Sequence, residues 1–146
     1  MTATLTPSTV TAVPSTPATS PRTRGLRTTT LVSGLVGAAV TTAAAAGLHA
    51  AGVSFEIDGE MIPILGFAQM TFVGALIGGL LLAVLNRRSD APGRRFLQVS
   101  AVLTAVSCLP SVAWPDDAAS QLTLVALHVL AAAIIVPVLA RHAADA

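Results

Sequence analysis

The chain has 146 residues, of which 53% are hydrophobic and 10% are charged, and its mean hydropathy is +0.78. Soluble domains carry about 25% charged residues, so this composition excludes an ordinary water-soluble globular protein. A net charge of +1 and an aromatic content of 3% leave neither the basic surface nor the stacking side chains of a nucleic-acid-binding protein. The length corresponds to a single domain.

Thr, Ser, Pro and Ala dominate residues 1–27. Such a segment buries too little apolar surface to offset the entropy lost on ordering, so we expect a disordered tail. The many threonines leave a regulatory or phosphorylated tail as the functional alternative. The membrane domain then covers residues 28–142, followed by a short C-terminal segment, residues 143–146.

Charged residues divide the rest of the chain into four uncharged runs of 28, 26, 20 and 23 residues. About 20 apolar residues in a helix cross the hydrocarbon core of a bilayer, and only a helix satisfies the backbone of a single span there. The runs therefore predict four transmembrane helices, at about residues 30–52, 64–86, 96–114 and 121–140. Since the connections are short, we expect an all-α, up-down-up-down bundle.

All eight cationic residues are arginines, and they precede the first span, follow the fourth or lie between the second and third. Five of the seven acidic residues lie in the two opposite loops. The positive-inside rule therefore predicts a multi-pass protein whose N-terminal tail and C-terminus are cytoplasmic. The arginines are Arg22, Arg24, Arg27, Arg87, Arg88, Arg94, Arg95 and Arg141.

The first run could instead be a signal peptide that is cleaved within residues 43–46, where alanines match a cleavage site. Cleavage would leave three spans and an external N-terminus. The apolar stretch continues past that site to Val53, which favours a membrane helix.

The loop after the first span predicts a short extracytoplasmic β-hairpin. Apolar and polar residues alternate on both sides of Asp58-Gly59, a pair that favours a type I′ turn because both positions need positive φ. Pro63 then suits the start of the second helix, where its missing N–H costs nothing.

Small residues predict where the helices pack, because they let membrane helices approach closely. Gly37 lies on the first helix, and Gly74 and Gly78 form a small-xxx-small pair on the second. We expect this pair to pack within the chain, with homo-oligomerisation through Gly74 and Gly78 as the alternative. The third helix carries a hydroxyl stripe, whose side chains can bond to their own backbone: Ser100, Thr104, Ser107 and Ser111.

Polar residues at membrane depth are costly and are functional candidates by default. Placed by a rise of about 1.5 Å per residue, five of them fall in the outer half of the bilayer. The functional hypothesis is a polar pocket that opens to the outside beneath the acidic hairpin. The interpretation that we favour is that His128 and Gln69 hydrogen-bond across helices and that His49 reaches the interface. The five are His49, Gln69, Ser107, Cys108 and His128.

Sequence motifs offer little support for catalysis or metal binding. The two histidines with Glu56, Asp58 and Glu60 are metal-ligand types, but no HxxxH or HxxE spacing occurs. The histidines also differ in depth by about two helical turns, which suits bis-histidine haem poorly. No Gly-x-Ser-x-Gly motif is present. We therefore expect no enzyme, no metal and no cofactor.

Four segments carry a family resemblance: residues 55–63 (FEIDGEMIP), 66–71 (GFAQMT), 74–79 (GALIGG) and 126–137 (ALHVLAAAIIVP). Together they resemble a group of small, uncharacterised four-helix integral membrane proteins of actinobacteria. The resemblance covers about residues 28–142 and implies a bacterial plasma membrane and a place in the cell envelope. Because no activity is known for the group, no catalytic residue is carried over.

We expect a structural or interaction protein whose partner is the lipid bilayer or an unknown membrane protein. The alternative is a small-molecule or lipid binder, or a transporter subunit, that uses the pocket around His128, Gln69 and His49.

Overall fold

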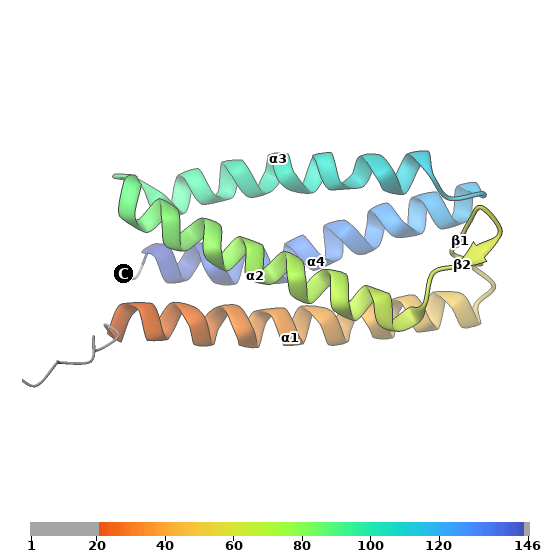
Figure 1. Ribbon diagram of the computed structural model, residues 1–146, viewed down its shortest axis with the longest axis horizontal. Coiled ribbons are helices and arrows are strands. Elements are labelled where there is room, and N and C mark those ends of the chain that lie inside the picture. Colours follow the sequence, from red (N-terminus) through yellow and green to blue (C-terminus); the bar gives the residue numbers. More distant parts are fainter. Residues whose placement is uncertain (1–20, 145–146) are drawn as a thin grey trace, which may run out of the picture.

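The computed structural model describes residues 21–144, which form four long helices and one short hairpin. Consecutive helices run antiparallel and are joined by short connections (Figure 1). The predicted all-α, up-down-up-down bundle is therefore confirmed. In chain order the elements are α1 (Pro21–Ala50), β1 (Glu56–Ile57), β2 (Glu60–Met61), α2 (Ile64–Arg88), α3 (Pro92–Ala113) and α4 (Ala118–Ala144).

All four helices are long and apolar enough to cross a membrane, and the chain is a multi-pass membrane protein. The helices extend past several predicted ends, most of all in α1. It begins at Pro21, so residues 21–27, expected to end a disordered tail, are instead its first turns. Proline is well suited to the first turn of a helix, and Leu26 is buried against α2 and α4, a contact that composition does not reveal. The predicted tail at residues 1–20 lies outside the described residues.

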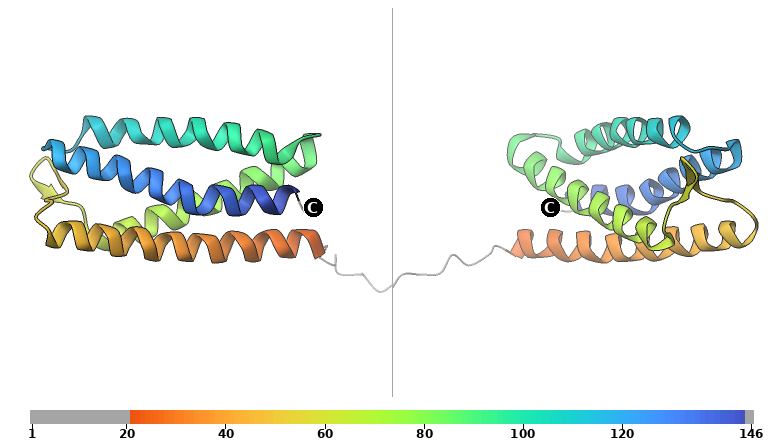
Figure 2. Two further views of the ribbon diagram at one scale, coloured as in Figure 1. Left: turned by 180° about the vertical axis from the view of Figure 1, so that it is seen from behind. Right: turned by 45° about the vertical axis from the view of Figure 1, so that its right-hand side comes forward.

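The two ends of the bundle differ in charge. The start of α1, the α2–α3 turn and the end of α4 lie together at the Arg-rich end, while the hairpin and the α3–α4 loop lie at the acidic end (Figures 1 and 2). Antiparallel packing thus gathers charges that are scattered along the sequence. The Arg-rich end holds Arg27, Arg87, Arg88, Arg94, Arg95 and Arg141, and the acidic end holds Glu56, Asp58, Glu60, Asp116 and Asp117.

Small residues bring α1 and α2 into close contact. A Cβ atom added to Gly34 would lie 2.9 Å from the Cβ of Ala75, and one added to Gly79 would overlap the side chain of Thr30. Such contacts drive helix association in lipid, where burial of apolar surface adds little. Among the helical glycines of the described residues, those with the closest neighbours therefore lie between α1 and α2.

The three glycines predicted to mediate packing behave differently. A Cβ on Gly37 would lie 3.0 Å from Cδ1 of Ile135 on α4, and one on Gly78 would lie 3.4 Å from Cδ1 of Leu139. A Cβ on Gly74 would meet no atom within 4 Å. Gly37 and Gly78 thus lie against side chains of α4, whereas Gly74 faces open space.

The predicted hairpin is confirmed, with β1 paired antiparallel to β2. Its turn has positive φ at both central positions, 53° at Asp58 and 76° at Gly59, as a type I′ turn requires. Phe55, just before β1, also has a positive φ of 53°. Its ring is fully buried in a cluster that includes Ala45 of α1 and Leu124 of α4, so the hairpin is anchored to the bundle.

Candidate functional site

A cavity of about 710 Å³ lies between α2, α3 and α4. α2 crosses the bundle obliquely: it is close to α3 at the Arg-rich end and close to α1 at the acidic end (Figures 1 and 2). The divergence of α2 from α3 opens the cavity, and residues of α4 close its inner side. We call this space the α2–α3 cavity.

The α2–α3 cavity is a long trough. Phe96 and Leu139 line it near the Arg-rich end, and Ile57 of the hairpin and Trp114 line it at the acidic end. Trp114 follows Phe96 by 18 positions, which span about 27 Å at the rise of an α-helix, close to the thickness of about 30 Å of a bilayer core. The cavity therefore extends along most of the bundle, whereas the sequence had suggested a pocket confined to the half next to the hairpin.

The predicted hydroxyl stripe of α3 faces this trough, since all four of its members line the cavity. The Ser107 hydroxyl donates to the Thr104 carbonyl oxygen at 2.8 Å. On the opposite wall, the hydroxyls of Thr41 and Thr71 lie 3.0 Å apart, and Thr41 also donates to the Gly37 carbonyl oxygen at 2.9 Å. These hydroxyl groups already form hydrogen bonds inside the bundle, yet their oxygens can accept a further hydrogen bond from a ligand.

His128 is the one ionisable side chain among the described residues that line the cavity. Its Nδ1 lies 2.9 Å from the Leu124 carbonyl oxygen and 3.4 Å from the Ser111 hydroxyl. A carbonyl oxygen only accepts, so this bond places the proton on Nδ1 and leaves Nε2 as an acceptor in the neutral ring. His128 and Ser111 thus form a small polar group in a trough that is otherwise mostly apolar.

The structure brings only two of the five predicted pocket residues, Ser107 and His128, to the α2–α3 cavity. His49 is exposed at the end of α1, where its Nδ1 lies 2.9 Å from the Val53 carbonyl oxygen. Gln69 is exposed, and Cys108 is a half-buried free thiol; neither lines the cavity. One residue changes the direction of a helical side chain by about 100°, so depth alone could not separate Cys108 from Ser107.

Two acidic residues connect the hairpin to the bundle, a role that the sequence did not reveal. The carboxylate of Asp116 accepts the backbone N–H groups of Asp58 at 3.2 Å and Gly59 at 2.9 Å. The backbone N–H of Asp116 donates to the Glu56 carbonyl oxygen at 3.1 Å. Asp116 therefore fixes the hairpin turn as well as adding negative charge to the acidic end.

Asp117 is the second of these residues and caps the start of α4. Its carboxylate accepts the backbone N–H of Ser120 and the hydroxyl of Ser54, both at 2.9 Å, and the Ser120 hydroxyl oxygen accepts the N–H of Phe55 at 3.0 Å. The hydroxyl and N–H of Ser120, followed by the hydroxyl of Ser54, lower the pKa of Asp117 to about 2, because these bonds favour the ionised form. An aspartate before a helix is a common N-cap; an earlier predicted start for α4 would have identified it.

The acidic end also contains carboxylates, which are residue types that can bind metal ions. Within residues 21–144, no group of three or more His, Cys, Asp or Glu side chains is arranged to hold a metal ion. Asp116 and Asp117 instead bind backbone and hydroxyl groups. The candidate site for a ligand is the α2–α3 cavity.

Comparison with known proteins places the chain in a family without assigning an activity. No curated protein and no solved structure matches the chain. A family of unknown function, DUF6069, matches residues 21–145, which includes all four helices and the hairpin. The match contains the region expected to carry the family resemblance and begins where α1 begins. The chain therefore belongs to DUF6069, a family of unknown function.

Proposed function

We propose that this membrane protein binds an elongated, amphipathic small molecule or lipid in the α2–α3 cavity. The shape and lining of the cavity carry the proposal. Its volume of about 710 Å³ falls in the range of about 300–1,000 Å³ that is typical of ligand pockets. Mostly apolar walls combined with a few polar groups, here Ser111 and His128, are also typical of such pockets.

The lining favours a ligand without charge. None of the described residues that line the cavity is Asp, Glu, Lys or Arg, and an unpaired charge is costly to transfer into apolar surroundings. A hydroxyl, carbonyl or ester group on the ligand could instead bond to Ser111 or to Nε2 of His128. The hydrocarbon part would extend along the trough toward Phe96. The proposed role is binding, and it assigns no catalytic step.

Filling the cavity tests this proposal. Gly74 lines it, and nothing lies within 4 Å of an added Cβ, so the side chain of Gly74→Phe is expected to extend into the trough. Gly47→Phe is a matched control, because Gly47 has the same open surroundings on α1 and does not line the cavity. We expect Gly74→Phe to lower ligand occupancy at least about tenfold, or about 1.4 kcal/mol of binding free energy, and Gly47→Phe to leave it unchanged. Native mass spectrometry of proteins purified in mild detergent measures occupancy.

Both variants are expected to fold, because phenylalanine favours a helix more than glycine does. Equal ligand content in the two variants would contradict the proposal, as would wild-type protein that carries no ligand. In the second case, the structural or interaction role that the sequence favours would take its place. His128→Ala then tests the polar group: reduced ligand binding with an intact fold supports its contact with the ligand.

We further propose that the Arg-rich end lies in the cytoplasm of a bacterial cell and the acidic end outside the plasma membrane. The sorting of charge between the two ends of the bundle supports this orientation, since arginine-rich loops stay on the cytoplasmic side. Both the start of α1 and the end of α4 would then be cytoplasmic.

Cysteine labelling tests the orientation. Cys108 is the single cysteine of the chain, so Cys108→Ala provides a background without thiols. Glu60→Cys and Asp90→Cys introduce exposed thiols at the acidic and Arg-rich ends, respectively. In intact cells we expect a membrane-impermeant maleimide to label only the first variant, and to label the second after permeabilisation. If only Asp90→Cys were labelled in intact cells, the orientation would be the opposite of the one proposed.

A further inference from the structure

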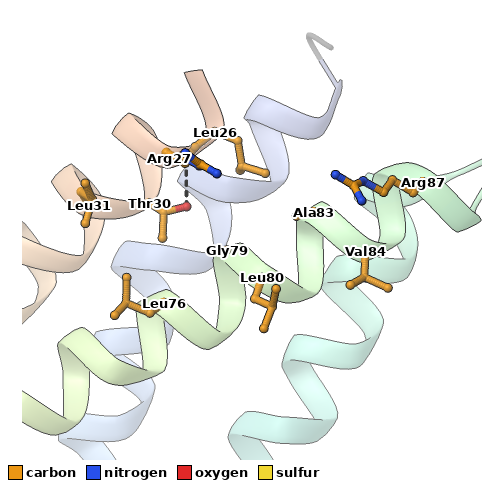
Figure 3. A pocket seen from close by; sticks show the side chains of 10 residues that line it. All are labelled: Leu26, Arg27, Thr30, Leu31, Leu76, Gly79, Leu80, Ala83, Val84 and Arg87. Atoms are coloured by element: carbon orange, nitrogen blue, oxygen red, sulfur yellow. Dashed lines mark hydrogen bonds between the residues drawn. The ribbon is translucent and has the colours of Figure 1, made fainter. Parts of the chain in front are cut away.

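A second groove, of about 540 Å³, lies between α1 and α2 at the Arg-rich end. Thr30 and Gly79 lie at its base, where the two helices meet, and Leu31 and Leu80 are among the apolar residues along it. Arg27 of α1 and Arg87 of α2 also line it (Figure 3). The groove therefore combines an apolar channel with two cationic side chains from different helices.

The two arginines lie at one end of this groove. In Figure 3, Arg27 and Arg87 stand on opposite sides of the charged end, and Leu76 lies at the other end of the view. Both arginines are exposed, and neither forms an ion pair with an acidic residue in the part of the chain that the structure describes. Two guanidinium groups that line one end of the same groove without an acidic partner favour binding of an anion at that end.

The length of the groove matches one leaflet of a bilayer. Arg87 follows Leu76 by 11 positions, which span about 16 Å along α2, roughly half of the hydrocarbon thickness of about 30 Å. If Arg87 lies at the level of the lipid headgroups, the apolar part of the groove extends to about the middle of the membrane. One acyl chain could therefore lie along the groove while its headgroup contacts both arginines.

We propose that this groove is a binding site for an anionic phospholipid, with the phosphate held between Arg27 and Arg87 and one acyl chain packed along Leu31, Leu76 and Leu80. Guanidinium groups bind phosphate oxygens through paired, charge-assisted hydrogen bonds. Basic pockets between membrane helices recognise anionic headgroups in this way. The groove uses a different face of α2 from the α2–α3 cavity, so the site does not depend on the proposed function.

Two charge-matched double variants test the site. Arg27→Gln with Arg87→Gln removes both cations that line the groove. Arg94→Gln with Arg95→Gln removes two exposed cations from the same end of the bundle that do not line it. Detergent-purified proteins are titrated with phosphatidylglycerol, with phosphatidylcholine and with inorganic phosphate, and bound lipid is counted by native mass spectrometry.

We expect the Arg27/Arg87 variant to bind phosphatidylglycerol about 30-fold more weakly, the effect of losing two arginine contacts with an anionic lipid. The Arg94/Arg95 variant should change binding less than threefold, about 0.7 kcal/mol or less. Equal weakening by both pairs would show a general charge effect and overturn the site. Equal binding of phosphatidylcholine by the wild-type protein would overturn recognition of the anionic headgroup. Competition by inorganic phosphate at equal concentration would overturn the role of the acyl chain.

Discussion

Replacing Gly79 with alanine is expected to destabilise the bundle by about 1–3 kcal/mol, the usual cost of adding atoms to a well-packed interior. A Cβ at this position overlaps the side chain of Thr30. Thr30 cannot easily move away, because it is buried and its hydroxyl donates to the Leu26 carbonyl oxygen at 2.8 Å. The helices must therefore separate, which also loosens the contact between Gly34 and Ala75. Unfolding titrations in mixed detergent micelles measure the loss.

Gly74→Ala is the control for this prediction, since it adds the same methyl group on the same helix. No atom lies within 4 Å of that methyl group, and alanine favours a helix over glycine by about 1 kcal/mol. Gly74→Ala should thus leave stability unchanged or raise it by up to about 1 kcal/mol. Equal stability of the two alanine variants would mean that α1 and α2 are less tightly packed at Gly79 than the structure indicates.

Phe55→Ala is expected to cause the largest loss of stability, about 3–5 kcal/mol, as other buried phenylalanines do when truncated to alanine. The Phe55 side chain is 0% exposed, and its ring packs edge-on against that of Phe67 with 5.2 Å between centroids. It also belongs to the buried cluster with Leu124 and Leu127 that closes the acidic end. The same detergent titration, monitored by circular dichroism, measures the change.

Met61→Ala provides the comparison, because Met61 belongs to the same hairpin but is 48% exposed. Its truncation should change stability by less than about 0.5 kcal/mol, as most surface substitutions do. A loss of similar size in Phe55→Ala and Met61→Ala would contradict the view that the hairpin is anchored through Phe55. A small effect of both would indicate that the acidic end contributes little to folding.

The helices and the hairpin could be predicted because local patterns determine them. Uncharged runs long enough to cross a bilayer must form helices, since lipid offers no hydrogen bonds to the backbone. Asp58 and Gly59 form the expected turn because few residues adopt positive φ at two successive positions. The start of α1 at Pro21 was missed because the first turns of the helix contain arginines and lie before the apolar run. Packing of Leu26 against α2 and α4 accompanies this extension of the helix.

The candidate site could be predicted only in part. Helical spacing showed that Ser100, Thr104, Ser107 and Ser111 share one face, and that face lines the cavity. Which of His128, Gln69 and His49 line the same cavity depends on how each helix is rotated about its axis. The apolar face of a membrane helix does not reveal this rotation, because lipid and bundle interior are similarly apolar.

By itself, the sequence of this protein determined the number of membrane spans, their alternating direction and the separation of arginines from acids. These features follow from bilayer thickness and from the unequal cost of charge on its two sides. Only the tertiary structure decided which side chains meet. The oblique path of α2 opens the α2–α3 cavity on one face and the groove beside Arg27 and Arg87 on another. The close contact at Gly34 and Gly79 holds α2 against α1, and such contacts join residues far apart in the chain.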